Sequence, residues 1–174
     1  MKKLFVTIAV MFCAVVSYAQ NAPKNHLIEL NFGVVKDYSD SPNNNSVYTT
    51  AVYDYVFGCN IGAGVGIGYF KTETAHIPNS FKCNSVPLFA DFRWLPNLTR
   101  RIKFVGVLEG GFVINSSDIH NFNSDYGHYL SAQAGFRIKI VDLLGLNARF
   151  VYNNFKSFET INSIGGIIGL SFSF

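Results

Sequence analysis

The sequence is poor in charged residues, in cysteine and in long apolar runs. Asp, Glu, Lys and Arg make up 14% of the 174 residues, whereas Phe, Trp and Tyr alone make up 16%. That ratio is unusual for a water-exposed surface. Beyond residue 19 no apolar run approaches the roughly 20 residues of a membrane-spanning helix. No basic patch indicates a nucleic-acid partner, and we expect none.

The first 19 residues are the one apolar stretch, and they have the pattern of a secretory signal peptide. Lys2 and Lys3 precede an apolar run over 4–16, and small residues stand three and one positions before the predicted cleavage after Ala19. The apolar run is too short for a retained membrane helix. Cleavage lowers the formal charge of +3 by two and leaves residues 20–174 as one domain.

The mature sequence alternates between apolar and polar residues. In the last segment Ile164, Ile168, Leu170, Phe172 and Phe174 share one face, while serine and glycine, interrupted by Ile167, occupy the other. A period of two predicts a β-strand with two different environments. The same alternation predicts eight strands, over residues 26–35, 47–57, 61–70, 85–95, 102–114, 130–140, 146–153 and 163–174.

The connections between these segments alternate in length. Those over 36–46, 71–84, 115–129 and 154–162 are long and polar, and those between them are short. This rhythm is typical of a membrane barrel with short periplasmic turns and long outer loops. We therefore predict an all-β, eight-stranded, antiparallel, up-and-down transmembrane β-barrel with both mature termini in the periplasm.

The period alone does not say which face points outward, since a soluble lipocalin-like barrel also alternates. The polar face favours lipid outside, because it mixes small residues with charges of both signs that can pair in a narrow interior. Aromatic residues on the apolar face gather near the strand ends, as at a bilayer interface. The predicted lumen charges are Glu29, Asp54, Asp91, Arg93, Glu109, Arg137 and Arg149.

Two cysteines, Cys59 and Cys83, remain after cleavage. A disulfide would suit the oxidising periplasm. In the predicted topology these residues lie at opposite ends of the barrel, beyond the roughly 4.4–6.8 Å between Cα atoms that a bridge needs. We expect two unpaired thiols.

The C-terminal residues resemble a known signature of outer-membrane proteins. Gly169, Phe172 and Phe174 match its glycine and its aromatics at the third-last and last positions, although Ile167 departs from the usual polar residue. With the stretch VPLFADFRW over 86–94, the chain is similar to the OmpX/OmpA-type barrels. The resemblance implies outer-membrane lipid as surroundings, a monomer, and recognition of the last strand by the barrel assembly machinery.

Some barrels that resemble this one modify lipid A, so we looked for enzyme motifs. The deacylase type has a serine two positions after a histidine, but His26, His76, His120 and His128 are followed there by Ile, Pro, Phe and Leu. The palmitoyltransferase type needs histidine, aspartate and serine. These residue types do occur near His120, but any polar loop of this composition would contain them. Metal-ligand spacing is also absent. We predict no catalytic, cofactor or metal site.

The expected function is a non-enzymatic scaffold that presents surface loops to an unknown extracellular ligand. The loop aromatics Tyr38, Phe81, Phe122 and Tyr126 are candidates for that contact. The interior charges have two interpretations, a salt-bridged plug or a narrow ion path. A small porin-like channel is therefore the alternative function, followed by a lipid A-modifying enzyme.

Overall fold

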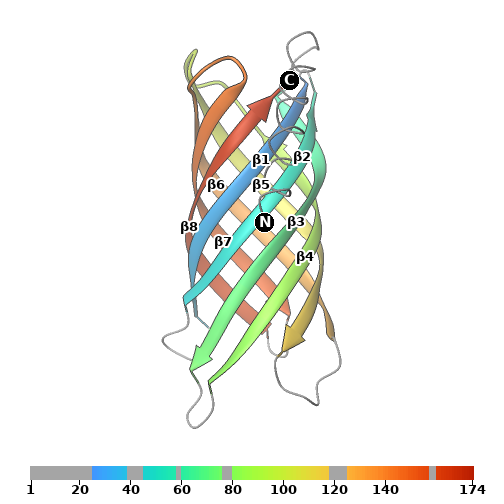
Figure 1. The fold of residues 1–174 in the computed structure, drawn as a ribbon. Helices are drawn as coiled ribbons and strands as arrows, with labels where there is room; N and C mark the ends of the chain where they lie inside the picture. Colours follow the sequence, from blue (N-terminus) through green and yellow to red (C-terminus); the bar gives the residue numbers. More distant parts are fainter. Residues whose placement is uncertain (1–24, 39–44, 58–59, 76–79, 118–124, 157–159) are drawn as a thin grey trace, which may run out of the picture.

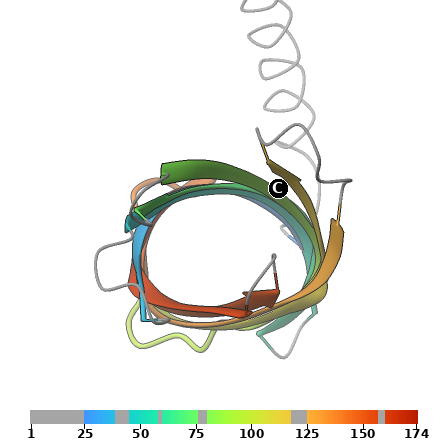
Figure 2. The same cartoon turned by 90° about the horizontal axis from the view of Figure 1, so that it is seen from below.

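The computed structural model describes residues 25–38, 45–57, 60–75, 80–117, 125–156 and 160–174. Each strand pairs antiparallel with the next, and β1 also pairs with β8, so the sheet closes without a free edge (Figures 1 and 2). This confirms the predicted all-β barrel. The strands are β1 His26–Asp37, β2 Asn45–Val56, β3 Ile61–Ala75, β4 Ser80–Trp94, β5 Ile102–Ser117, β6 Asp125–Lys139, β7 Leu144–Lys156 and β8 Thr160–Ser173.

Within those ranges, no helix is long and apolar enough to cross a membrane.

One end of the barrel, here called the turn end, holds the connections β2–β3, β4–β5 and β6–β7. Both ends of the described chain also lie there, because His26 and Phe174 exchange two backbone hydrogen bonds of 2.8 and 3.0 Å. Figure 1 shows this end at the top, with the C-terminus. Asn60 closes the β2–β3 turn with a φ of 61°, a left-handed conformation that Asn tolerates. The opposite end is called the loop end.

The strands extend further toward the loop end than the alternation predicted. Residues 71–75 and 80–84, placed in a long connection from the sequence, continue the β3–β4 ladder from Lys71↔Asn84 to Ala75↔Ser80. Residues 125–129 likewise pair with residues 111–115 of β5, and Ser116 and Ser117 pair with β4. Apolar and polar residues alternate only where one face of a strand lies in an apolar environment. Backbone hydrogen bonds between strands can continue where both faces contact water. The polar strand ends were therefore mistaken for loops.

The outer wall is apolar and is bordered by aromatic side chains at both ends. Leu108, Phe150 and Ile168 have about six-tenths of their surface exposed in the middle of the wall. Aromatics exposed toward the turn end are Tyr55, Phe57, Phe92 and Trp94, and those toward the loop end are Tyr69, Phe112 and Tyr152. A bilayer suits such a wall, because hydrocarbon covers the middle and the amphipathic rings sit at its two interfaces.

Candidate functional site

Arg93 lies at the centre of the lumen, where it meets three carboxylates. Its Nη1 lies 3.0 Å from Glu29 Oε2 on β1 and its Nη2 lies 2.8 Å from Asp54 Oδ2 on β2. Its Nε donates to Asp91 Oδ1 on β4 at 2.8 Å. The Arg93 side chain has no exposed surface. The planar guanidinium presents five donors, which lets one arginine tie these strands together through the interior.

Arg149 extends this cluster to β7. Its Nη1 lies 3.0 Å from the same Glu29 Oε2 that Arg93 binds, and its Nη2 donates to Asn31 Oδ1 at 2.8 Å. Asn147 Nδ2 donates to the other carboxylate oxygen of Glu29 at 2.6 Å. Glu29 is thus held by three side chains. We call Glu29, Asp54, Asp91, Arg93 and Arg149 the charged layer.

The two remaining predicted charges face the lumen without joining these ion pairs, although Glu109 on β5 lies directly opposite Asp91 on β4. Glu109 accepts a hydrogen bond from the Tyr129 hydroxyl at 2.7 Å and makes no ion pair with any described residue. Arg137 donates to Ser173 Oγ at 2.6 Å near the turn end, and it too has no carboxylate partner within the described ranges. The seven predicted charges therefore do not form one network.

Apolar clusters lie on both sides of the charged layer. On β1, β2 and β4 the inward residue two positions toward the turn end is apolar: Leu27 precedes Glu29, Val56 follows Asp54, and Leu95 follows Arg93. On β7 the corresponding neighbour of Arg149 is the polar Asn147. Together with Val105 and Val107 the three apolar residues form one cluster, the turn-side layer. On the other side lies the aromatic layer, which contains Val35, Tyr48, Val52, Phe70, Phe89, Tyr129, Val151, Phe155 and Ile167.

The aromatic layer was not predicted from the sequence, where the inner face was expected to carry only small and charged residues. Tyr48 and Phe70 stack with ring centres 4.7 Å apart, and Phe155 and Tyr129 pack against Phe70. Ile167, which interrupts the polar face of the last strand, is buried in this layer. The two-residue alternation could have predicted that Tyr48 points inward, because Tyr48 lies an even number of residues from Asp54 and so shares its face.

The layered arrangement makes the charged layer a dry electrostatic cluster. Charges attract more strongly where water is excluded. Burial also costs solvation energy, which is recovered only when each ion has close partners. Arg93 and Glu29 meet that condition. The arrangement links β1, β2, β4 and β7 through the interior of the barrel.

The described residues offer no assembled catalytic or metal site. No cluster of three or more His, Cys, Asp or Glu residues within those ranges could hold a metal ion. His26 Nδ1 lies 2.7 Å from the Tyr53 hydroxyl and His128 Nε2 lies 2.9 Å from Asn154 Oδ1, and neither contact involves a serine, threonine or cysteine. His76, His120 and Cys59 lie outside the described residues, as does the predicted signal peptide. Cys83 is placed in β4.

The residues of the C-terminal signature occupy the end of β8. Gly169 faces the lumen opposite Asn31, where a Cβ atom would overlap the Asn31 side chain. Phe172 pairs with Ile28 of β1, and the Phe174 ring stacks on His26 with centres 5.5 Å apart. Their packing joins the two strands that close the barrel. Recognition by the assembly machinery stays a prediction.

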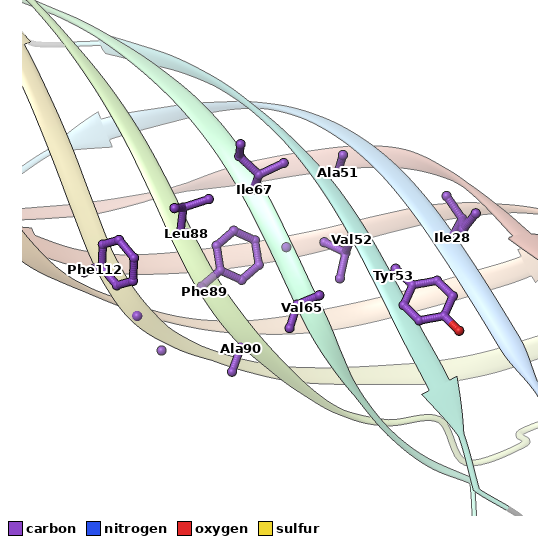
Figure 3. Close-up of a pocket in the computed structure, with 13 residues that line it drawn as sticks. Ile28, Ala51, Val52, Tyr53, Val65, Ile67, Leu88, Phe89, Ala90 and Phe112 are labelled. Atoms are coloured by element: carbon purple, nitrogen blue, oxygen red, sulfur yellow. The ribbon is translucent and has the colours of Figure 1, made fainter. Parts of the chain in front are cut away.

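A groove of about 700 Å³ lies on the outer wall, across β2 to β5. Figure 3 shows Val65, Ile67, Leu88, Ala90 and Phe112 around it. Small residues on neighbouring strands leave this part of the outer wall hollowed, and its lining is almost entirely apolar. Such a surface suits hydrocarbon chains and carries no polar chemistry.

The barrel is similar in fold to solved outer-membrane proteins. Neisserial surface protein A (NspA) matches with a TM-score of 0.65 at 13% identity, over 86% of this chain and 97% of NspA. Ail, the attachment invasion locus protein of Yersinia pestis, in complex with the heparin analogue sucrose octasulfate, matches with a TM-score of 0.56 at 12% identity, over 86% and 96% of the two chains. The N-terminal β-barrel domain of Pseudomonas aeruginosa OprF matches with a TM-score of 0.53 at 8% identity, over 87% and 98%.

No protein-family model matches the sequence, and the comparison with curated proteins finds no significant match. At these identities the structural matches concern the fold. The chain has the fold of the small eight-stranded outer-membrane barrels, in agreement with its resemblance to the OmpX/OmpA type. That fold supports an outer-membrane location.

Proposed function

We propose that this chain is a non-enzymatic outer-membrane barrel whose lumen is closed and whose work is done by its loop end. The observation that carries this proposal is the charged layer held between two apolar layers. An eight-stranded barrel has an interior just wide enough for side chains. Arg93 and its three carboxylates fill it, and the aromatic layer covers them. A continuous water path would have to cross all three layers.

With the lumen closed, the loop end is the surface left for binding. Tyr38 and Tyr126 lie there with 68% and 70% of their surface exposed. Phe81 lies in β4, and Phe122 falls outside the described residues. Ail, a barrel of the same fold, is an attachment protein solved with a heparin analogue, so this scaffold can present a binding surface. We infer that the loop end faces outward and contacts an extracellular ligand, with the barrel acting as a monomer.

Ion conductance in planar bilayers tests the closed lumen. We expect the refolded mature protein to show no discrete openings, with heat-dependent gel mobility as proof of folding. A Phe89→Ala variant, which thins the aromatic layer but leaves the charged layer, should also be silent. Reproducible openings of the folded wild-type protein would contradict the plug and establish the alternative, a small porin-like channel.

The lipid A-modifying alternative has a separate test. Expression of the protein in a Gram-negative host should leave the mass of lipid A unchanged, because the described contacts of His26 and His128 include no serine, threonine or cysteine. A new lipid A species that depends on expression would overturn the non-enzymatic proposal.

A further inference from the structure

Basic side chains gather at the turn-end mouth of the barrel. Lys103 on β5 and Arg137 on β6 are direct cross-strand partners and both are half-buried. The backbone N–H of Lys139 donates to the Arg101 carbonyl at 2.7 Å, which brings the β4–β5 connection against the end of β6. The result is a small cavity of about 150 Å³, lined by Arg100, Arg101, Lys103, Arg137, Lys139, Asp142 and Ser173.

The described side chains that line this cavity do not balance its charge. Lys139 pairs with Asp142, the only acid that lines the cavity. The other four cations make no ion pair with any residue that the structure describes. Like charges at directly opposed positions of two strands destabilise a sheet. Arg93 shows the contrast, since the same fold surrounds that arginine with three carboxylates.

The local packing holds Arg137 at this mouth. Arg137 Nη2 donates to Ser173 Oγ at 2.6 Å. Gly145 on β7 makes room for the arginine, because a Cβ atom there would lie 2.7 Å from Arg137 Nε and 2.8 Å from Ser171 Oγ. Arg137 is thus kept at the mouth, on the side of the other cations.

We propose that this cluster, the basic mouth, is a binding site for a phosphate group. Four unpaired cations call for an anion with several acceptor oxygens, and guanidinium groups match phosphate by paired N–H···O bonds. The cavity is about ten times the ~10–15 Å³ that one water needs, which is room for one phosphate group but not for a large ligand. The phosphate could come from a soluble ion or from the headgroup of an anionic phospholipid.

Phosphate titration of the refolded mature protein tests this site. Inorganic phosphate is titrated by calorimetry against chloride at the same ionic strength, because salt alone screens exposed charges. The variant Arg100→Gln/Arg101→Gln removes two exposed cations of the mouth, and Lys36→Gln/Lys156→Gln removes the same charge at the loop end. We expect the first pair to weaken phosphate binding by about three- to tenfold, the range for exposed ion pairs, and the second to leave it unchanged.

A second arm separates the two sources of phosphate. The same three proteins are reconstituted in phosphatidylcholine nanodiscs with or without phosphatidylglycerol, and retained lipid is counted by native mass spectrometry. Phosphatidylglycerol retention that only the mouth variant loses, without binding of free phosphate, supports a headgroup site. Saturable binding of free phosphate supports a soluble anion. Binding of neither, or equal loss in both variants, overturns the proposal.

Discussion

At the scale of single residues, Arg93 differs from every other lumen charge. It is one of the seven charges predicted for the lumen, yet it alone contacts three carboxylates. From the sequence Arg93, Arg137 and Arg149 are equivalent, because alternation fixes only the face on which a side chain lies. Which charges meet depends on strand register and on side chains crossing the lumen, so Glu109 and Arg137 could not be separated from the cluster beforehand.

Removal of Arg93 should destabilise the barrel strongly. We expect Arg93→Ala to lower the free energy of unfolding by about 3–5 kcal/mol, because it leaves buried carboxylates without a partner. Urea unfolding of the refolded protein in detergent measures this, and Lys36→Ala, which removes an exposed charge, should change little. Adding Asp54→Ala to Arg93→Ala should recover part of the loss. If the two changes are additive, lost packing rather than unpaired charge explains the effect.

At the scale of elements, the glycines of β3 make room for the lumen contents. Gly62, Gly64, Gly66 and Gly68 all face inward beneath larger neighbours. A Cβ atom at Gly62 would lie 2.8 Å from Arg93 Cγ, and one at Gly66 would overlap the Phe89 ring. At Gly64 the obstacle is the carbonyl oxygen of Tyr53, which a side-chain rotation cannot relieve. A narrow barrel can hold the Arg93 and Phe89 side chains because the inner face of β3 carries only glycines between residues 62 and 68.

Two glycine substitutions separate this packing role from strand propensity. Gly64→Ala should lower the free energy of unfolding by about 1–3 kcal/mol, the usual cost of overpacking. Gly166→Ala adds the same methyl group on the outer wall, where nothing lies within 4 Å, and should be neutral or stabilise by up to ~1 kcal/mol. Equal effects of both changes on thermal unfolding would argue against a special role for β3.

At the scale of the whole molecule, closure of β1 on β8 sets both chain ends at the turn end. The four connections that the sequence predicts to be long lie at the opposite end, although strand pairing shortens β3–β4 and β7–β8. The predicted rhythm of short and long connections is the basis for the inference that the loop end faces outward. The basic mouth would accordingly open to the periplasm. These two statements depend on one orientation, and a single labelling experiment addresses it.

Orientation can be read from two exposed positions at opposite ends. In a Cys59→Ser/Cys83→Ser background, Tyr38→Cys lies at the loop end and Leu98→Cys in the β4–β5 connection, with native side chains 68% and 57% exposed. A membrane-impermeant maleimide should label Tyr38→Cys in intact cells and Leu98→Cys only after lysis. The reverse pattern would place the basic mouth at the cell surface.

The strand count, the closed topology and the face of the predicted lumen charges could be inferred from the sequence. All three follow from local information, namely the two-residue alternation of side chains and the lengths of the connections. The strand ends were predicted wrongly, because polar residues beyond the apolar band give no alternation. The folded barrel, in contrast, fixes that five charges meet, that Glu109 and Arg137 make no ion pair among the described residues, and that an aromatic layer lies beside them. Those contacts join residues up to 118 positions apart, such as Asn147 and Glu29, and depend on register and barrel width, which no local pattern encodes.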